Sequence, residues 1–222
     1  MTRWSLVVAA AADAEPSLEA LCRQYWHPVY AVARSAGNDP ETTKDLTQGF
    51  FAKLLEKGWL GAADQDKGRF RTFLVTALKR YMVNEWHREH TAKRGGFADV
   101  VPLDTEHAER ISALDGRHEL PPDALFDRRW ALALLDQAMS RLGSEHAGGN
   151  FDLLKECLTA GRGETDYADL AAAMGINEGA ARVAVHRLRK RYRSVIREEV
   201  ARTVTEESEV DDEMRALMDA LM

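Results

Sequence analysis

The sequence predicts an all-α protein made of two small helical domains joined by a flexible linker, with a helix-turn-helix in the C-terminal domain. The 222 residues are dominated by Ala, Leu, Glu and Arg, and only 8% are aromatic. Apolar residues recur at helical spacing through most of the chain, and glycines and prolines cluster between the periodic stretches. Composition and spacing of this kind are typical of amphipathic helices, so we expect little or no sheet.

The N-terminal domain is predicted to span residues 1–94 and to contain three main helices. The first, over 16–37, includes Pro28, where a kink or a break is expected because proline removes a backbone donor. The second and third are expected over 40–58 and 68–94, and each begins after a stretch that contains glycine or proline.

The third of these helices mixes aromatic and cationic residues. Arginine and lysine can hold a phosphate backbone, and exposed rings can stack on bases that have left the duplex. We expect most of the rings to lie in the core, because large aromatic residues are usually buried. Tyr81 and Trp86 are the two rings that we expect to be available to bases.

Beyond residue 94 the helical spacing lapses, and residues 95–121 are predicted to be the linker. The C-terminal domain is expected over 122–202, beginning with a helix at about 123–142. Residues 203–222 form an acidic tail, with seven acidic residues and one arginine. Apolar residues at helical spacing near its end predict either docking on a surface or a frayed terminus.

The helix-turn-helix is predicted within residues 164–197. Gly175 can take the left-handed conformation that ends a helix, and Asn177 is a good N-cap for the next one. The second helix has one apolar side, and between residues 182 and 202 the chain carries eight arginines or lysines. A helix that enters the major groove of DNA needs this arrangement, whereas the alternative is a solvated basic helix on an ordinary bundle.

Other classes of protein are not indicated. Cys22 and Cys157 lie far apart without neighbouring metal ligands, so we expect buried thiols in a reduced compartment. His87 and His90 share a helix face but no third ligand is apparent, so no metal and no other cofactor is predicted. Without a phosphate-binding glycine loop or a nucleophile elbow, the chain is not expected to be an enzyme. The apolar stretch 1–12 is interpreted as a short helix instead of a secretory signal, no segment has the length of a membrane span, and we expect a cytoplasmic protein.

Three blocks of the sequence resemble, in order and separation, a bacterial RNA polymerase sigma factor of the extracytoplasmic-function (ECF) group, in a divergent form with a long linker. Residues 21–57 are similar to the segment that docks on core polymerase, and they include the run Asp45-Leu46-Thr47-Gln48. Residues 70–94 are similar to the helix that opens and reads the minus-ten promoter element. Residues 167–191 look like the helix-turn-helix that reads the minus-thirty-five element.

The resemblance implies roles for particular residues. The residues expected to contact core polymerase are Asp45, Gln48 and Phe51. Those expected near minus-ten DNA are Arg71, Lys79, Arg80, Asn84, Trp86 and Arg88. Those expected at the minus-thirty-five groove and its phosphates are Glu178, Gly179, Arg182, Val183, His186, Arg187, Arg189 and Lys190.

The implied partners are core RNA polymerase and promoter DNA, with an anti-sigma or other regulatory protein as a further candidate. Two alternatives stay open from the residues alone. One is a helix-turn-helix transcription regulator whose N-terminal domain does not bind polymerase. The other is a helical adaptor whose basic faces bind acidic proteins, and its binding would depend less steeply on salt than binding to DNA does.

Overall fold

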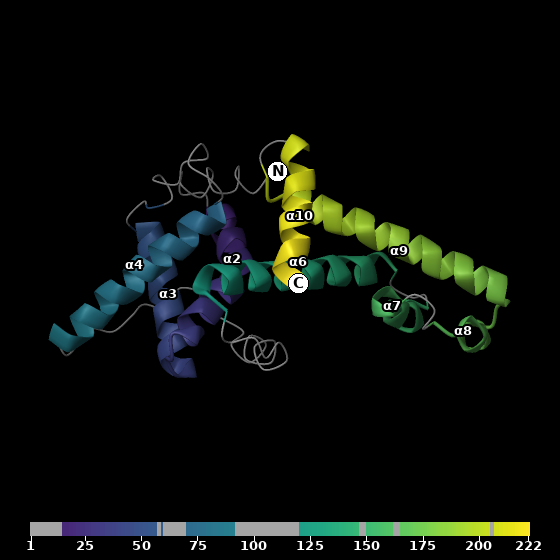
Figure 1. Ribbon diagram of the computed structural model, residues 1–222, viewed down its shortest axis with the longest axis horizontal. Helices are drawn as coiled ribbons and strands as arrows, with labels where there is room; N and C mark the ends of the chain where they lie inside the picture. The colour runs from purple at the N-terminus through teal and green to yellow at the C-terminus, as the bar shows by residue number, and fades with distance from the viewer. Residues whose placement is uncertain are drawn as a thin grey trace. The chain divides into compact units, whose positions relative to one another are not determined.

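The computed structural model describes residues 15–56, 59, 70–91, 120–146, 150–161, 165–204 and 207–222. In these residues the regular structure is helical and contains no strand, which confirms the predicted all-α class (Figure 1). The linker predicted at 95–121 lies almost wholly outside the described residues, as does the helix predicted at 1–12. None of the described helices has the length and apolar content needed to cross a membrane.

The chain divides into two compact units. The first unit runs to Ala133 and also includes Arg202–Met222, and the second is Leu134–Ala201. The division therefore falls inside a helix, whereas the sequence places it in a linker before residue 122. The helices are α2 (Glu15–Ser35), α3 (Pro40–Glu56), α4 (Phe70–Thr91), α6 (Pro122–Glu145), α7 (Phe151–Thr159), α8 (Tyr167–Met174), α9 (Glu178–Ala201), the 3-10 turn η3 (Glu207–Glu209) and α10 (Val210–Leu221).

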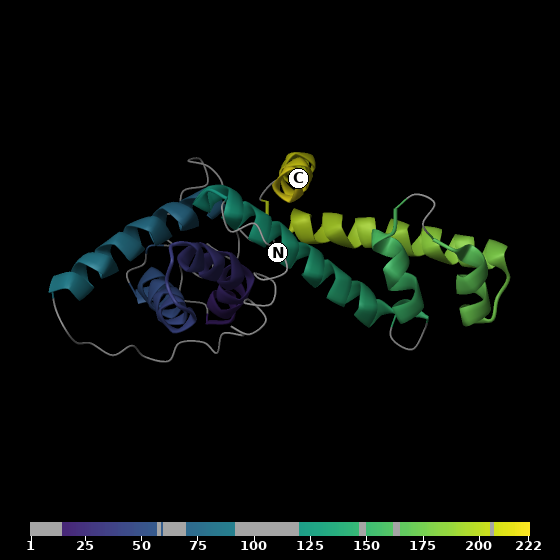
Figure 2. The ribbon, with the colours of Figure 1, turned by 60° about the horizontal axis from the view of Figure 1, so that its bottom comes forward.

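The core of the first unit forms where α2, α3 and α4 pack together (Figure 2). The edge of the Tyr25 ring meets Phe70 at a centroid distance of 5.3 Å, and Phe50 of α3 lies 5.8 Å from Tyr81 of α4. Burial of these rings and of the surrounding leucines contributes about 25 cal/mol per Å² of apolar surface removed from water. This packing holds α4 at a fixed position on the unit.

The sequence predicts a kink or a break at Pro28, but helix α2 continues through this residue, so the break does not occur. A proline inside a helix costs roughly 3 kcal/mol because it removes one hydrogen bond and crowds the preceding turn. Tyr25 and Val29 are buried on either side of it. Their packing offsets that cost and keeps the helix continuous.

Helix α3 begins with a capping site at Asp39. Its Oδ1 accepts hydrogen bonds from the backbone N–H groups of Glu41 and Thr42, both at 3.0 Å, and the Thr42 hydroxyl donates to Oδ2. The Thr42 bonds hold the pKa of the Asp39 carboxyl below its usual value. Pro40 occupies the first helical position, where no intrahelical donor is needed.

The second unit contains the two-helix element predicted at 164–197. Asp166 caps α8, Gly175 ends it in the left-handed conformation at φ 67°, and the Asn177 side chain accepts from the Ala180 N–H at 2.8 Å. The predictions for Gly175 and Asn177 are confirmed, and the Asp166 cap is an additional finding. The apolar side of α9 is buried as predicted, through Ala181, Val185, Leu188 and Val195.

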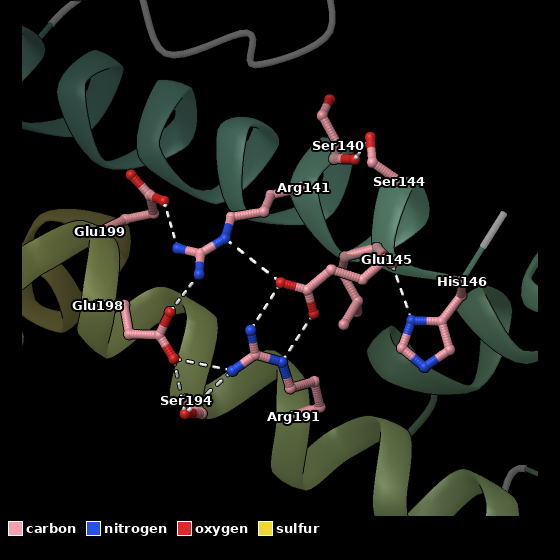
Figure 3. Close-up of polar contacts among 10 residues, drawn as sticks. Ser140, Arg141, Ser144, Glu145, His146, Arg191, Ser194, Glu198 and Glu199 are labelled. Atoms are coloured by element: carbon pink, nitrogen blue, oxygen red, sulfur yellow. Dashed lines mark hydrogen bonds and ion pairs between the residues drawn. The ribbon is translucent and has the colours of Figure 1, made fainter.

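A network of ion pairs joins α6 to α9 within the second unit (Figure 3). Arg191 donates to Glu145 at 2.6 and 2.7 Å and to Glu198 at 2.8 Å. Arg141 donates to Glu198 and, at 3.0 Å, to Glu199, which is fully buried. The hydrogen bond from Arg191 lowers the pKa of Glu145, and with those from Ser194 and Arg141 it lowers the pKa of Glu198 to about 2.

Candidate nucleic-acid interface

In the first unit, the outward side of α4 combines cationic, amide and apolar groups. Its inward side is fixed by Leu74, Leu78 and Tyr81, which are all buried. On the other side, residues separated by three, four and seven positions share one helix face. We call this exposed set the α4 face, and it consists of Arg80, Val83, Asn84, Trp86 and His87. The Trp86 side chain is 56% exposed, as predicted for a ring available to a ligand.

Two further cations of α4 are engaged by carboxylates. Lys79 pairs with Asp123 at 2.7 Å, and both side chains keep considerable exposure. Arg88 is exposed and donates to Glu85 at 2.8 and 2.9 Å. Burial raises the pKa of Glu85, but hydrogen bonds from Lys53 and Arg88 outweigh it and lower the pKa overall. Lys79 and Asp123 are both exposed, so this pair is weak enough for Lys79 to exchange the carboxylate for a phosphate, whereas the Glu85 partner of Arg88 is buried.

Two residues of α4 that the sequence assigns to nucleic acid are buried in this structure. Arg71 is only 5% exposed, and its guanidinium stacks on the Trp130 ring at 3.8 Å. Tyr81 is 1% exposed and lies beneath the Lys53 ammonium at 4.9 Å. The prediction that the Tyr81 ring faces bases is therefore wrong, and Arg71 is enclosed by protein groups instead of facing solvent.

Helix α3 carries the residues assigned to a protein partner. Asp45 is exposed and Gln48 is half-buried, so their side chains reach the surface of the first unit. Phe51 is 3% exposed and packs against Phe50 with ring centroids 5.5 Å apart. It belongs to the core, so the prediction that it contacts polymerase is corrected. Its position on the apolar side of the helix was the signal for burial.

In the second unit, the outward side of α9 begins with an acidic residue and a glycine and continues with mostly basic residues. We call this exposed set the α9 face, and it consists of Glu178, Gly179, Arg182, Val183, His186, Arg187 and Lys190. Val183 is 48% exposed although it is apolar. An exposed methyl-bearing side chain among cations is suited to contact an apolar group of a charged ligand, such as a thymine methyl.

Arg182 is held in place by two neighbours. It donates to Glu178 one turn earlier, and its guanidinium lies over the Tyr167 ring of α8 at 4.3 Å. At an exposed site the i,i+4 pair contributes about 0.2–0.5 kcal/mol and the cation–π contact about 0.5–1 kcal/mol. The Arg182 fork is thereby oriented at the first turn of α9.

Two cations of α9 serve the fold. Arg189 donates to the Cys157 carbonyl at 2.7 and 3.1 Å and to the Ala160 carbonyl at 3.3 Å, so it caps the end of α7. Helix ends leave carbonyls without intrahelical partners, and a cation there is stabilising. Arg191 belongs to the ion-pair network with Glu145 and Glu198. The Nε and Nη2 groups of Arg189 are thus engaged by backbone carbonyls, so Arg189 is not the fully exposed phosphate contact that the sequence predicts.

Sequence reasoning missed the contacts that neutralise these cations. The spacing of Arg141 and Glu145 was a local signal, because residues four apart on a helix are neighbours. Nothing in the sequence connects Arg71 with Glu213, which lies 142 positions further along and forms an ion pair with it.

Cys22 and Cys157 are free and buried as predicted, and burial raises the pKa of the Cys22 thiol to about 11.

The described residues bring no three His, Cys, Asp or Glu side chains together in a way that could hold a metal ion. The exposed groups of the α4 face and the α9 face are mostly hydrogen-bond donors and cations, with one large ring, two valines and the Glu178 carboxylate. These are groups that bind phosphates, base edges and unstacked bases. Fold and surface chemistry together define an all-helical protein with faces suited to a nucleic acid.

Residues 21–91 match the family model described as Sigma-70 region 2. The match covers most of α2 and all of α3 and α4, and it includes the α4 face. It supports a sigma factor role in the recognition and melting of promoters by RNA polymerase. No curated protein and no solved structure matches the chain.

Proposed function

We propose that this protein is a sigma factor of the extracytoplasmic-function type, which directs core RNA polymerase to specific promoters and assists their melting. The observation that carries the proposal is the Sigma-70 region 2 match over residues 21–91. In the proposed role the protein acts by binding, and we expect it to act beside RNA polymerase in the cytoplasm. A regulator that never meets polymerase would have no use for such a domain.

The α4 face is proposed to bind the minus-ten element. Trp86 offers an exposed ring on which a base leaving the duplex can stack, and base–aromatic stacking is worth about 1–3 kcal/mol. Arg80 and Asn84 lie on the same exposed side of the helix and supply a cation and an amide. We assign Arg80 to the backbone and Asn84 to a base edge, because arginine holds phosphate and an amide can pair with adenine.

The α9 face is proposed to enter the major groove of the minus-thirty-five element. Base contacts come from its first turns, where Arg182 is already oriented by Glu178 and Tyr167. Lys190 lies two turns later and is exposed, so we assign it to phosphates. The polymerase contact is assigned to Asp45 and Gln48 on α3, by resemblance to the family.

The test is transcription in vitro with purified core polymerase and a library of genomic fragments. We expect the protein to select a set of start sites, whereas polymerase alone does not. Pull-down of core polymerase should succeed with the wild type and weaken with Asp45→Ala, while Asp169→Ala on α8 serves as the matched control. If core polymerase is not recovered and no start site is selected, a plain transcription regulator becomes the better description.

Two variants of α9 separate sequence reading from phosphate contact. Arg182→Ala is expected to weaken binding at particular promoter sequences by roughly 1–3 kcal/mol, and Lys190→Ala to weaken all duplexes alike and reduce the salt slope by about one. The measurement is fluorescence anisotropy on selected and shuffled duplexes between low and moderate salt. Equal losses on both duplexes from both variants would contradict the assignment of residues on α9.

A further inference from the structure

The C-terminal helix α10 is docked on the first unit. Val210 and Leu217 are 2% and 1% exposed, and they lie seven positions apart on one side of the helix. Burying two such side chains contributes about 1.5–3 kcal/mol each. Val210 and Leu217 of the acidic tail are therefore covered by protein, whereas Met218 is 58% exposed, and the tail belongs to the same unit as α4.

A buried arginine binds α10 to α4. The two terminal nitrogens of Arg71 lie 2.5 and 3.4 Å from the carboxylate oxygens of Glu213, whose side chain is 9% exposed. The Arg71 Nε lies 3.1 Å from Asp127 of α6, but the Asp127 side chain is 44% exposed. The two terminal nitrogens of the Arg71 guanidinium thus face a carboxylate of α10, in the bidentate arrangement with which arginine also binds a phosphate.

The far end of α10 is held by a second cation. Arg128 of α6 donates from Nη1 to the Leu221 carbonyl at 2.9 Å, and Figure 1 shows α10 crossing α6. A cation at a helix C-terminus satisfies unpaired carbonyls and the helix dipole. Residues 207–222 carry six carboxylates and one arginine, so this docked segment places a strongly negative surface on the unit that carries the α4 face.

We propose that α10 is an intramolecular competitor for nucleic acid: its Glu213 carboxylate occupies the Arg71 guanidinium in place of a backbone phosphate, and its other carboxylates repel DNA from the first unit. Release of α10 frees one phosphate-binding cation and removes several negative charges. The promoter as the competing ligand rests on the proposed function, whereas the competition itself is a property of the first unit.

The test compares the full chain with a chain that ends at Arg202, using a fluorescein-labelled 30-base-pair mixed-sequence duplex and a 20-nucleotide poly-dT strand. The truncated chain is expected to bind both probes several-fold more tightly. Its plot of log K against log salt on the duplex should be steeper by about 0.9, the value for one additional phosphate contact. Adding Arg71→Ala to the truncated chain should restore the shallower slope. Unchanged affinity, or a gain in affinity and in salt slope that Arg71→Ala does not reduce at all, would overturn the proposal.

Two point variants of the full chain keep the test independent of truncation. Glu213→Gln and Asp219→Asn each remove one negative charge from α10, but Asp219 is exposed and only Glu213 meets Arg71. We expect faster amide exchange in α10 from Glu213→Gln alone, and a larger gain in DNA affinity from Glu213→Gln than from Asp219→Asn, which removes only a repelling charge. Equal affinities of the two variants would refute the competition, even if the protein still directs transcription. Loss of promoter selection with core polymerase would refute the proposed function instead.

Discussion

Gly175 sets the turn between α8 and α9, and replacing it with alanine tests that geometry. Its backbone has φ 67° and ψ 32°, its N–H donates to the Ala172 carbonyl at 3.2 Å, and the following N–H of Ile176 reaches the Ala171 carbonyl at 3.0 Å. A Cβ atom at this position would meet no heavy atom within 4 Å. The cost of Gly175→Ala therefore comes from the backbone conformation and not from a clash.

The magnitude follows from the left-handed conformation. It costs an L-residue with a Cβ about 1–2 kcal/mol relative to glycine. The second unit, Leu134–Ala201, is small, and a domain of its size has a total stability of only ~3–10 kcal/mol. For such a domain each kcal/mol shifts the unfolding midpoint by about 4–8 °C. We expect Gly175→Ala to lower the midpoint of the second unit by about 4–16 °C.

The assay uses two probes of the full chain. All five tryptophans lie outside residues 134–201, so tryptophan fluorescence follows the first unit while far-ultraviolet circular dichroism follows both. The circular dichroism transition should move and the fluorescence transition should not. Gly175→Asn should lose less than Gly175→Ala, because asparagine tolerates the left-handed region. Gly179→Ala, inside α9, should change the midpoint less than Gly175→Ala. A wild-type midpoint for Gly175→Ala would refute the reasoning.

Three further predictions concern the second unit. The pKa of Glu198 is about 2 in the folded protein and ordinarily 4.5, so its ionised carboxylate stabilises the fold fully above pH 4.5 and this stabilisation is lost as the pH falls toward 2. Thermal unfolding midpoints at pH 2.5, 4 and 7 should show this loss. Glu198→Gln should reduce the dependence of the midpoint on pH. Leu188→Ala opens a cavity behind α9 and should cost ~2–5 kcal/mol in urea unfolding, a result that a loss below 1 kcal/mol would contradict. Asp166→Ala removes the cap of α8 and should cost ~1 kcal/mol, with Asp166→Asn as the conservative control.

Much of the fold could be predicted because it depends on local patterns. The third helix was expected over 68–94 and is found at Phe70–Thr91, since the spacing of its apolar residues defines one buried side. Gly175 has no Cβ and can take the left-handed conformation that ends α8, and the Asn177 side chain caps the start of α9. These features depend on residues within about ten positions of one another, which is the range over which helical periodicity and capping act.

The errors at the candidate site have a common physical cause. Arg71 and Arg189 are cationic and were assigned to a ligand, but each finds its counter-group on another helix. Tyr81 was placed on the wrong side because aromatic residues occur around much of α4, so periodicity alone did not decide which rings face the core. The partner of a cation depends on tertiary packing, and a charge count along one helix therefore overestimates the charge that is open to a ligand.

The placement of Arg182 between Glu178 and Tyr167 has a kinetic consequence. A long side chain normally surrenders up to about 2 kcal/mol of rotamer freedom when a ligand fixes it. Here most of that freedom is already gone in the unbound protein, because the guanidinium rests on a ring and against a carboxylate. In the proposed base contact, Arg182 would exchange one carboxylate partner for a base edge with little reordering, and we expect such complexes to dissociate slowly for their contact area.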